Sequence, residues 1–198
     1  MKIKICGLTR PCDIEAVNNA KPDYIGFVFA ESRRKVTLLQ ASQLRGKLNA
    51  GIIPVGVFVD ESIENILLPV REGVIEIIQL HGMENEDYIC ELKQRTEKPI
   101  IKAIGVRRKG DVQKWSETAA DFLLLDNSKG GTGLSFDWDL IGHTEKKFFI
   151  AGGLNAENII DVITRVAPFA VDVSSGVETD GFKNHEKIIE FIRRVRNG

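Results

Sequence analysis

Eight short apolar segments alternate with segments of helical periodicity along the 198 residues, and this alternation predicts a single α/β domain. Most of the apolar segments are continuous, which is typical of strands that are covered on both faces. Strands and helices in regular alternation imply parallel strands joined by right-handed crossovers. Eight such units predict a closed parallel sheet, the (β/α)8 or TIM barrel. Because such barrels usually need about 250 residues and rarely fewer than roughly 200, we expect a compact example that spans residues 1–198.

The predicted strands are short and bounded by polar or glycine-containing segments. In chain order they are Lys2–Ile5, Tyr24–Phe29, Val55–Val59, Ile75–Leu80, Ile100–Ile104, Phe122–Leu125, Phe148–Ala151 and Ala170–Val173. A doubly wound open sheet is the rival architecture, but it normally has fewer strands. The GxGxxG fingerprint of that fold does not follow the first strand here. The sequence also has no Pro/Gly/Ser-rich linker and no break in composition, which favours one domain.

Six segments between the strands have apolar side chains at helical spacing. They are Asp13–Asn19, Thr37–Leu48, Glu61–Val70, Asn85–Arg95, Asn155–Arg165 and Asn184–Arg196. Thr37 and Gln40 have the spacing of a capping box, and Asn155 is expected to be an N-cap. The segment 107–119 is polar and weakly patterned, so the fifth helix is predicted to be short or irregular. A brief helix is expected at Trp138–Ile141.

Composition and charge argue against several classes of protein. The chain has 27 Lys and Arg residues against 28 Asp and Glu residues, a formal net charge of −1. Nucleic-acid-binding domains usually have a clear basic excess, and nothing in this balance predicts a membrane surface as partner. The N-terminal apolar stretch is too short and too charged for a signal peptide, and no apolar run is long enough to cross a membrane. We therefore expect a cytoplasmic protein without a nucleic-acid or membrane partner.

The cysteines do not form a metal or redox motif. Cys6, Cys12 and Cys90 include no CxxC pair, so neither a zinc site nor a redox dithiol is predicted. Their small number favours a reducing compartment. Cys12 and Cys90 fall in predicted helices, where we expect them to pack.

Reactive side chains occur where the predicted strands end, which is where a barrel of this kind carries its active site. Cys6 follows the first strand, Arg33 and Arg34 the second, His81 the fourth and Asp126 the sixth. Each residue alone has a more ordinary interpretation: a small buried thiol, a solvated arginine pair, a hydrogen-bonding imidazole and a loop carboxylate. The barrel is what would bring them to one rim.

Glycine and serine follow the last two strands. Gly152 and Gly153 precede a predicted helix, and Ser174, Ser175 and Gly176 come directly after the eighth strand. Backbone N–H groups in these two loops are a common phosphate site in such barrels. Glycine lets the backbone approach phosphate oxygens closely, and serine adds hydroxyl donors. Tight turns are the alternative explanation. A third glycine cluster at 130–133 predicts a loop that can close over a ligand.

The order of these motifs resembles the phosphoribosylanthranilate isomerase family of tryptophan biosynthesis. The matching segments are Lys4–Thr9, Gly26–Phe29, Ser32–Arg34, Val55–Val59, Gln79–Gly82, Leu124–Asp126, Gly130–Gly133, Phe136–Trp138, Ala151–Leu154 and Asp172–Glu178. They follow in the same order over nearly the whole chain and at similar spacing. Together they are highly specific, although the single glycine pairs are not.

The resemblance implies an enzyme that performs an Amadori rearrangement on a small sugar phosphate. It implies N-(5-phosphoribosyl)anthranilate as substrate, its 1-deoxyribulose 5-phosphate isomer as product, and neither metal nor organic cofactor. The family's general base aligns with Cys6 and its general acid with Asp126. The arginine for the anthranilate carboxylate aligns best with Arg34, with Arg33 as the alternative. His81 is expected to contact substrate, and either a monomer or a homodimer is compatible.

The chemistry agrees with these residue types. Ring opening needs a proton on the sugar's ring oxygen, which a protonated Asp126 supplies, and formation of the enolamine needs a base at C2, which a Cys6 thiolate supplies. A histidine-pathway isomerase is one rival, but that family has an aspartate where this chain has Cys6. A phosphate-binding barrel without catalysis is the other, and it would have no reason to carry both Cys6 and Asp126.

Overall fold

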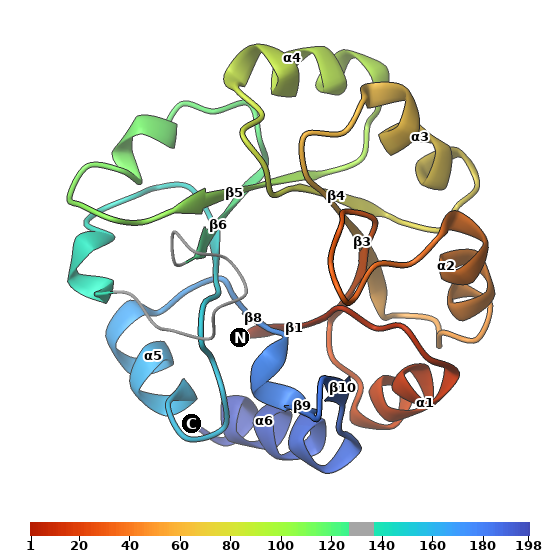
Figure 1. Ribbon diagram of the computed structural model, residues 1–198. Coiled ribbons are helices and arrows are strands. Elements are labelled where there is room, and N and C mark those ends of the chain that lie inside the picture. The colour runs from red at the N-terminus through yellow and green to blue at the C-terminus, as the bar shows by residue number, and fades with distance from the viewer. Residues whose placement is uncertain (127–136) are drawn as a thin grey trace.

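Eight parallel strands close into a ring, as predicted, in a computed structural model that describes residues 1–126 and 137–198 (Figure 1). The strands are β1 Lys2–Cys6, β2 Tyr24–Val28, β3 Ile53–Phe58, β4 Ile77–Leu80, β5 Ile100–Gly105, β6 Phe122–Asp126, β7 Phe148–Ile150 and β8 Ala170–Val173. β1 pairs with β2 on one side and with β8 on the other, which closes the barrel. The predicted strand limits are correct to within two residues, with the largest differences at the start of β3 and β4.

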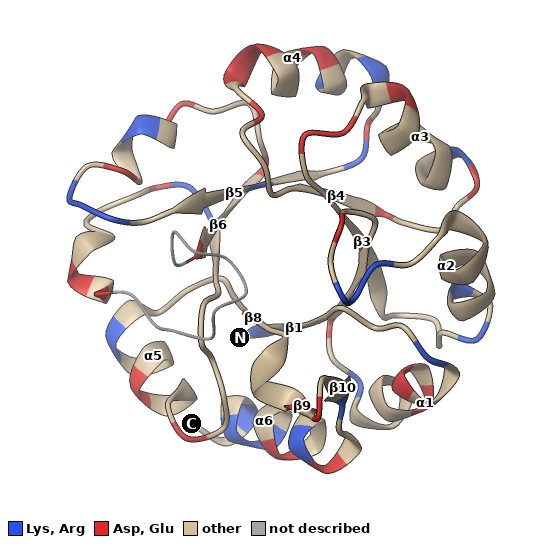
Figure 2. Cartoon of the chain, viewed as in Figure 1, with Lys and Arg blue, Asp and Glu red and all other residues tan. Residues whose placement is uncertain are grey.

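The α-helices form an outer ring around the strands (Figure 1). They are α1 Pro11–Ala20, α2 Leu38–Arg45, α3 Ile63–Arg71, α4 Glu86–Arg95, α5 Ile159–Val166 and α6 His185–Asn197. The capping box is confirmed, because Thr37 accepts from the Gln40 N–H and the Gln40 side chain accepts from the Thr37 N–H. Lys, Arg, Asp and Glu residues are distributed around this ring of helices (Figure 2).

The helix predicted from Asn155 begins four residues later, at Ile159. The Asn155 side chain caps a turn instead, since its Oδ1 accepts the N–H groups of Glu157 at 2.8 Å and Asn158 at 3.0 Å. The expectation that Asn155 is the N-cap of this helix is therefore wrong by one turn.

The predicted weakness of the fifth helix is confirmed. Between β5 and β6 the described chain contains only the 3-10 turn η1, Gln113–Trp115. Asp111 holds the preceding loop by accepting the N–H groups of Arg107 and Arg108. The brief helix predicted before β7 is the 3-10 turn η2, Trp138–Leu140.

A small hairpin between β8 and α6 was not predicted. After the 3-10 turn η3, Ser175–Val177, strands β9 Glu178–Thr179 and β10 Phe182–Lys183 pair in antiparallel fashion. Asp180 and Gly181 connect them with φ angles of 51° and 82°. An Asp-Gly pair in this left-handed conformation is a strong signal for a two-residue hairpin, so the sequence contained the information.

The apolar side chains form two layers. One fills the barrel interior and includes Val55, Leu124 and Phe149, and the other lies between the strands and the helices. Each fully buried side chain of this size contributes about 1.5–3 kcal/mol to stability. Cys12 and Cys90 belong to neither layer: both are exposed, so the expectation that they pack is wrong. Within the described residues, no helix is long and apolar enough to span a membrane.

Candidate active site

Cys6 ends β1 at the carboxyl rim of the barrel. Its side chain turns toward the barrel interior, as does that of Lys4 two residues earlier, because side chains alternate along a strand. Lys4 is fully buried and its Nζ lies 2.9 Å from Asp172 Oδ2, on the neighbouring strand β8. A buried charge is tolerated only with such a partner.

The electrostatic surroundings of Cys6 act in opposite directions. Burial raises the pKa of the Cys6 thiol above its ordinary value, while the positive charges of Lys4 and Lys183 lower it. The carboxylate of Asp172 adds to the upward shift. The thiol is therefore the resting form, and two cations are placed to stabilise the thiolate when it forms.

Asp126 ends β6 on the same rim, with two strands between it and β1 around the ring. The ring of His81, which follows β4, lies beside it: His81 Nε2 is 3.5 Å from Asp126 Oδ2. The Gln79 side-chain amide lies 2.8 Å from His81 Nδ1. An amide nitrogen only donates, so Nδ1 must accept and the imidazole proton sits on Nε2. Gln79 thus turns the His81 N–H toward Asp126.

The two arginines after β2 differ in placement. The loop that carries them lies over the ring of strands (Figure 1), and its basic stretch is blue in Figure 2. The Arg34 side chain is 15% exposed, whereas that of Arg33 is 59% exposed. The stem of Arg34 crosses Gly7, where an added Cβ would stand 2.4 Å from Arg34 Cδ. Only glycine at the residue after Cys6 admits this crossing, and its φ of 83° suits glycine as well.

Glu178 holds both arginines. Arg34 donates from Nε to Oε1 at 2.7 Å and from Nη2 to Oε2 at 2.9 Å. Arg33 donates from Nη2 to Oε2 at 2.7 Å. Lys183, on β10, adds a third cation at 2.6 Å from Oε1. Burial opposes ionisation of Glu178, but the hydrogen bonds from Arg34 and Lys183 outweigh it and lower the pKa of Glu178.

Ser174 connects this cluster to Cys6. Its hydroxyl donates to the Cys6 carbonyl at 2.9 Å, and Lys183 Nζ donates to the Ser174 carbonyl at 3.0 Å. The loop after β8 is therefore tied to the end of β1, and the Lys183 ammonium lies near the thiol.

The loops after β7 and β8 touch through their backbones. Gly152 and Gly153 have φ angles of 86° and 67°, in the region that favours glycine. A Cβ on Gly176 would stand 1.8 Å from the Leu154 carbonyl oxygen. The first N–H groups of the short turn η3, which begins at Ser175, have no acceptor within that turn. The backbones of the two loops are therefore packed against each other, and no side chain fits at residue 176.

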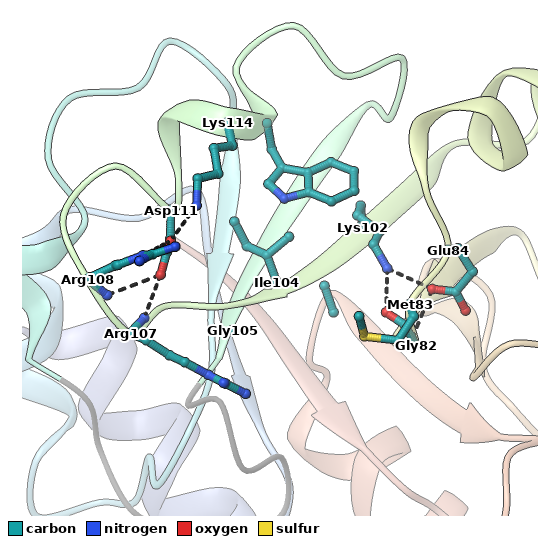
Figure 3. A pocket seen from close by; sticks show the side chains of 12 residues that line it. Gly82, Met83, Glu84, Lys102, Ile104, Gly105, Arg107, Arg108, Asp111 and Lys114 are labelled. Atoms are coloured by element: carbon teal, nitrogen blue, oxygen red, sulfur yellow. Dashed lines mark hydrogen bonds and ion pairs between the residues drawn. The ribbon is translucent and has the colours of Figure 1, made fainter.

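A cavity of about 600 Å³ lies beside this site, and none of the predicted site residues lines it (Figure 3). It opens between the loop after β4 and the turn η1, where a full fifth helix is lacking. Lys102 forms its buried floor and donates from Nζ to Gly82 O and to Glu84 Oε2, each at 2.7 Å. Its charge is satisfied inside the protein.

Sequence reasoning left some of these residues without a role. Lys183 had none, and Lys4, Gln79 and Glu178 were noted only as parts of motifs. The signals were present: Lys4 and Gln79 are polar residues in otherwise apolar strands, and Lys183 lies two residues after the Asp-Gly pair. The glycine cluster at 130–133 lies outside the described residues. The described residues contain no group of three or more His, Cys, Asp or Glu side chains placed to hold a metal ion.

Comparison with known proteins identifies the family. A family model for N-(5'phosphoribosyl)anthranilate (PRA) isomerase matches residues 3–194. The N-(5'-phosphoribosyl)anthranilate isomerase of Endomicrobium trichonymphae is 46% identical over 200 residues, which cover 99% of this chain and 98% of that protein. The crystal structure of phosphoribosyl anthranilate isomerase from Thermus thermophilus matches with a TM-score of 0.90 and 31% identity, over 100% of this chain and 99% of the other.

Two further solved structures are informative about ligand and assembly. One is a phosphoribosyl anthranilate isomerase in complex with reduced 1-(o-carboxyphenylamino)-1-deoxyribulose 5-phosphate, at 34% identity, a TM-score of 0.83 and full coverage of both chains. The other consists of monomers generated from the dimeric enzyme of Thermotoga maritima, at 34% identity, a TM-score of 0.85 and full coverage of both chains. The family model, the closely related sequences and the shared barrel agree: this chain belongs to the N-(5'-phosphoribosyl)anthranilate isomerase family.

Proposed function

We propose that this isomerase of tryptophan biosynthesis rearranges N-(5-phosphoribosyl)anthranilate with Cys6 as general base and Asp126 as general acid. The observation that carries these roles is their placement. Both residues end barrel strands at the carboxyl rim, and two strands separate them. A sugar bound between them would offer its ring oxygen to Asp126 and its C2 hydrogen to Cys6.

The reaction begins with opening of the furanose ring. Protonated Asp126 gives its proton to the ring oxygen while the bond from that oxygen to the anomeric carbon breaks, and the anthranilate nitrogen forms a Schiff base with that carbon. Asp126 becomes a carboxylate. The Nε2–H of His81, 3.5 Å away, is placed to stabilise the negative charge that develops.

Proton abstraction at C2 follows. The Cys6 thiolate takes the C2 proton, and the electron pair of that bond neutralises the Schiff base to give an enolamine. The enolamine then gains a proton at C1 and loses one from the C2 oxygen, which gives the ketose. Nothing is gained or lost overall, so the reaction needs no co-reactant.

Two groups of residues hold the ends of the substrate. The backbone of Gly152, Gly153 and Gly176, with the hydroxyl of Ser175, is proposed to bind the phosphate. Ser174 belongs to the same loop, but its single hydroxyl proton is donated to the Cys6 carbonyl. Arg34 is proposed to bind the anthranilate carboxylate, because its half-buried side chain crosses Gly7, the residue after Cys6, whereas Arg33 is mostly exposed. Arg34→Ala should chiefly weaken binding. If Arg33→Ala does so instead, the two arginines exchange roles.

The test is a turnover assay with substrate generated in situ, followed by loss of its fluorescence. Cys6→Ser and Asp126→Asn should each lower turnover by a factor of about 10²–10⁴, while Asp126→Asn still binds the reduced product analogue. Cys12→Ser and Asp121→Asn are matched controls, since Cys12 is an exposed thiol and Asp121 lies just before the opposite end of β6. Parental activity in either site variant removes that residue's role.

The family contains a dimeric member, that of Thermotoga maritima. For this chain, monomer and homodimer are distinguished by equilibrium sedimentation of the purified protein over a range of concentrations.

A further inference from the structure

Glu178 is a single buried carboxylate among three cations. Its side chain is 4% exposed and receives hydrogen bonds from Arg33, Arg34 and Lys183. Arg33 and Lys183 each contact one carboxylate oxygen, whereas Arg34 contacts both oxygens through two parallel hydrogen bonds. The strongest geometric constraint in the cluster is therefore the one between Glu178 and Arg34.

Glu178 occupies one edge of the Arg34 guanidinium, and this determines which N–H groups of Arg34 remain for a ligand. A guanidinium has five N–H groups, and Glu178 takes the Nε–H and one N–H of Nη2. The second N–H of Nη2 and both N–H groups of Nη1 remain. The outward pair, one from each Nη atom, forms a second fork that matches a carboxylate. Arg34 can therefore bind two carboxylates at once, one from the protein and one from a ligand.

Glu178 is itself held rigidly. It starts the hairpin of β9 and β10, where it lies opposite Lys183. Its carbonyl oxygen accepts from Lys187 Nζ at 2.8 Å, which ties the hairpin to α6. Arg10, before α1, donates to the Lys183 carbonyl at 2.9 Å. An anchor with these attachments can hold Arg34 in one orientation before any ligand arrives.

We propose that Glu178 is the positioning residue that aims Arg34 at the carboxylate of the substrate. It holds the Nε edge of the guanidinium, and this leaves the Nη edge for the anthranilate group. Preorganisation of this kind reduces the ordering cost of binding. The inference rests on the proposed binding role of Arg34. It goes further by assigning the enzyme's preference for a carboxylated aromatic amine to a residue that does not touch the substrate.

The experiment measures preference rather than affinity. Two ligands are titrated calorimetrically: the reduced product analogue, and the same compound made with aniline, which lacks the carboxylate. Glu178→Gln should reduce the preference for the carboxylated ligand by about tenfold, the effect of one misplaced charge-assisted hydrogen bond. Affinity for the aniline compound should hardly change. Glu178→Asp keeps the charge but is one methylene shorter, so it should restore only part of the preference.

A double-mutant cycle separates positioning from general structure. In an Arg34→Ala background, Glu178→Gln should cause no further loss of preference, because the residue through which it acts is gone. Glu84→Gln is the matched control: Glu84 is also a buried carboxylate paired with a lysine, Lys102, at the same end of the barrel. It should lower thermal stability without changing the preference.

Three results would overturn the inference. They are equal weakening of both ligands by Glu178→Gln, an undiminished effect of that substitution in the Arg34→Ala background, and full restoration by Glu178→Asp. A different result would contradict the proposed function: the unsubstituted enzyme would neither turn over substrate nor bind either ligand. An active enzyme that binds both ligands equally overturns the inference and the role of Arg34, but leaves Cys6 and Asp126 in place.

Discussion

Gly26 lies directly opposite Cys6 in the pairing of β1 with β2, and the thiol occupies the space that a side chain at residue 26 would need. A Cβ on Gly26 would stand 2.6 Å from Cys6 Sγ and 3.1 Å from its Cα. The proposed base is therefore accommodated by the absence of a side chain on the neighbouring strand.

Gly26→Ala should displace Cys6 and lower turnover. The clash involves both the side chain and the backbone of Cys6, so rotation of the thiol alone cannot relieve it, and overpacking of this kind costs about 1–3 kcal/mol. We expect lower thermal stability together with loss of kcat/KM. Gly56→Ala is the control. Gly56 lies on β3, and a Cβ there would stand 2.6 Å from Ile75 Cδ1, away from the proposed catalytic residues. It should lose stability but keep kcat/KM below its unfolding temperature. Equal kinetic losses in both variants would contradict the explanation.

Gly176→Ala should weaken phosphate binding. Its Cβ would overlap the Leu154 carbonyl oxygen at 1.8 Å, and only a shift of one backbone relative to the other can relieve this overlap. We expect affinity for the product analogue to fall by about tenfold or more, as for a loss of 1.4 kcal/mol. Titration calorimetry measures this loss. Gly46→Ala, whose Cβ meets nothing closer than 3.6 Å, should bind normally. Unchanged affinity in Gly176→Ala would exclude these loops as a phosphate site.

Gln79→Leu should allow His81 to adopt either neutral tautomer. The Gln79 amide at 2.8 Å holds Nδ1 as an acceptor, so its removal lets the proton occupy either ring nitrogen. Turnover should fall by roughly one to two orders of magnitude, the value of comparable orienting partners of metal-bound histidines. Nitrogen NMR shifts of the three histidines report the tautomer directly. Gln113→Leu is a control because that amide bonds backbone carbonyls outside the barrel. Unaltered His81 shifts in Gln79→Leu would refute the assignment.

The Cys6 thiol should titrate above the ordinary range of a cysteine. Burial raises the pKa of Cys6 above its ordinary value, so the thiolate should form only in the alkaline range. Because the proposed mechanism also needs a protonated Asp126, this titration is followed on the thiol itself and not through kcat/KM. Lys4 lowers the pKa of Cys6 more than Asp172 raises it, so Lys4→Met combined with Asp172→Asn should move the thiol titration to higher pH. The paired substitution avoids leaving a buried charge alone, which costs about 3–5 kcal/mol. Thiolate absorbance in a Cys12→Ser, Cys90→Ser background measures the titration. A thiol that titrates at or below the ordinary cysteine range, or that the paired substitution leaves unmoved, would contradict this account of its surroundings.

Stability in acid should depend on Glu178. The folded state lowers the pKa of Glu178 from 4.5, so its contribution is complete above about that pH. It is lost as the pH falls through the folded-state value, because the protonated acid no longer holds Arg34 and Lys183. Chemical denaturation of Glu178→Gln and the parent should therefore differ at pH 7 and converge in acid. Glu190→Gln, at a half-exposed helical site, should show a smaller difference at pH 7. A difference for Glu178→Gln that persists unchanged in acid would contradict the ion cluster.

The barrel was readable in the sequence because it depends on local patterns, and the family was readable from the order of its motifs. Continuous apolar runs and their regular spacing are sufficient for eight buried parallel strands, and a polar segment at 107–119 is sufficient for a missing helix. Two errors were also local. The hairpin at Asp180-Gly181 was overlooked although its turn signal was present. The start of α5 was misplaced because an asparagine side chain can cap a turn or a helix, and Asn155 caps a turn.

Tertiary structure alone decided which side chains share a partner. The sequence determined that Cys6, Arg34, His81 and Asp126 follow strands, and hence that they reach one rim. It did not determine that Glu178 lies within hydrogen-bonding distance of Arg34, 144 residues earlier in the chain. Nor did it show that Arg34 is half-buried while Arg33 is exposed. Strand position is encoded by short continuous apolar runs, but an ion pair across the rim depends on the closure of the whole ring, which no local pattern contains.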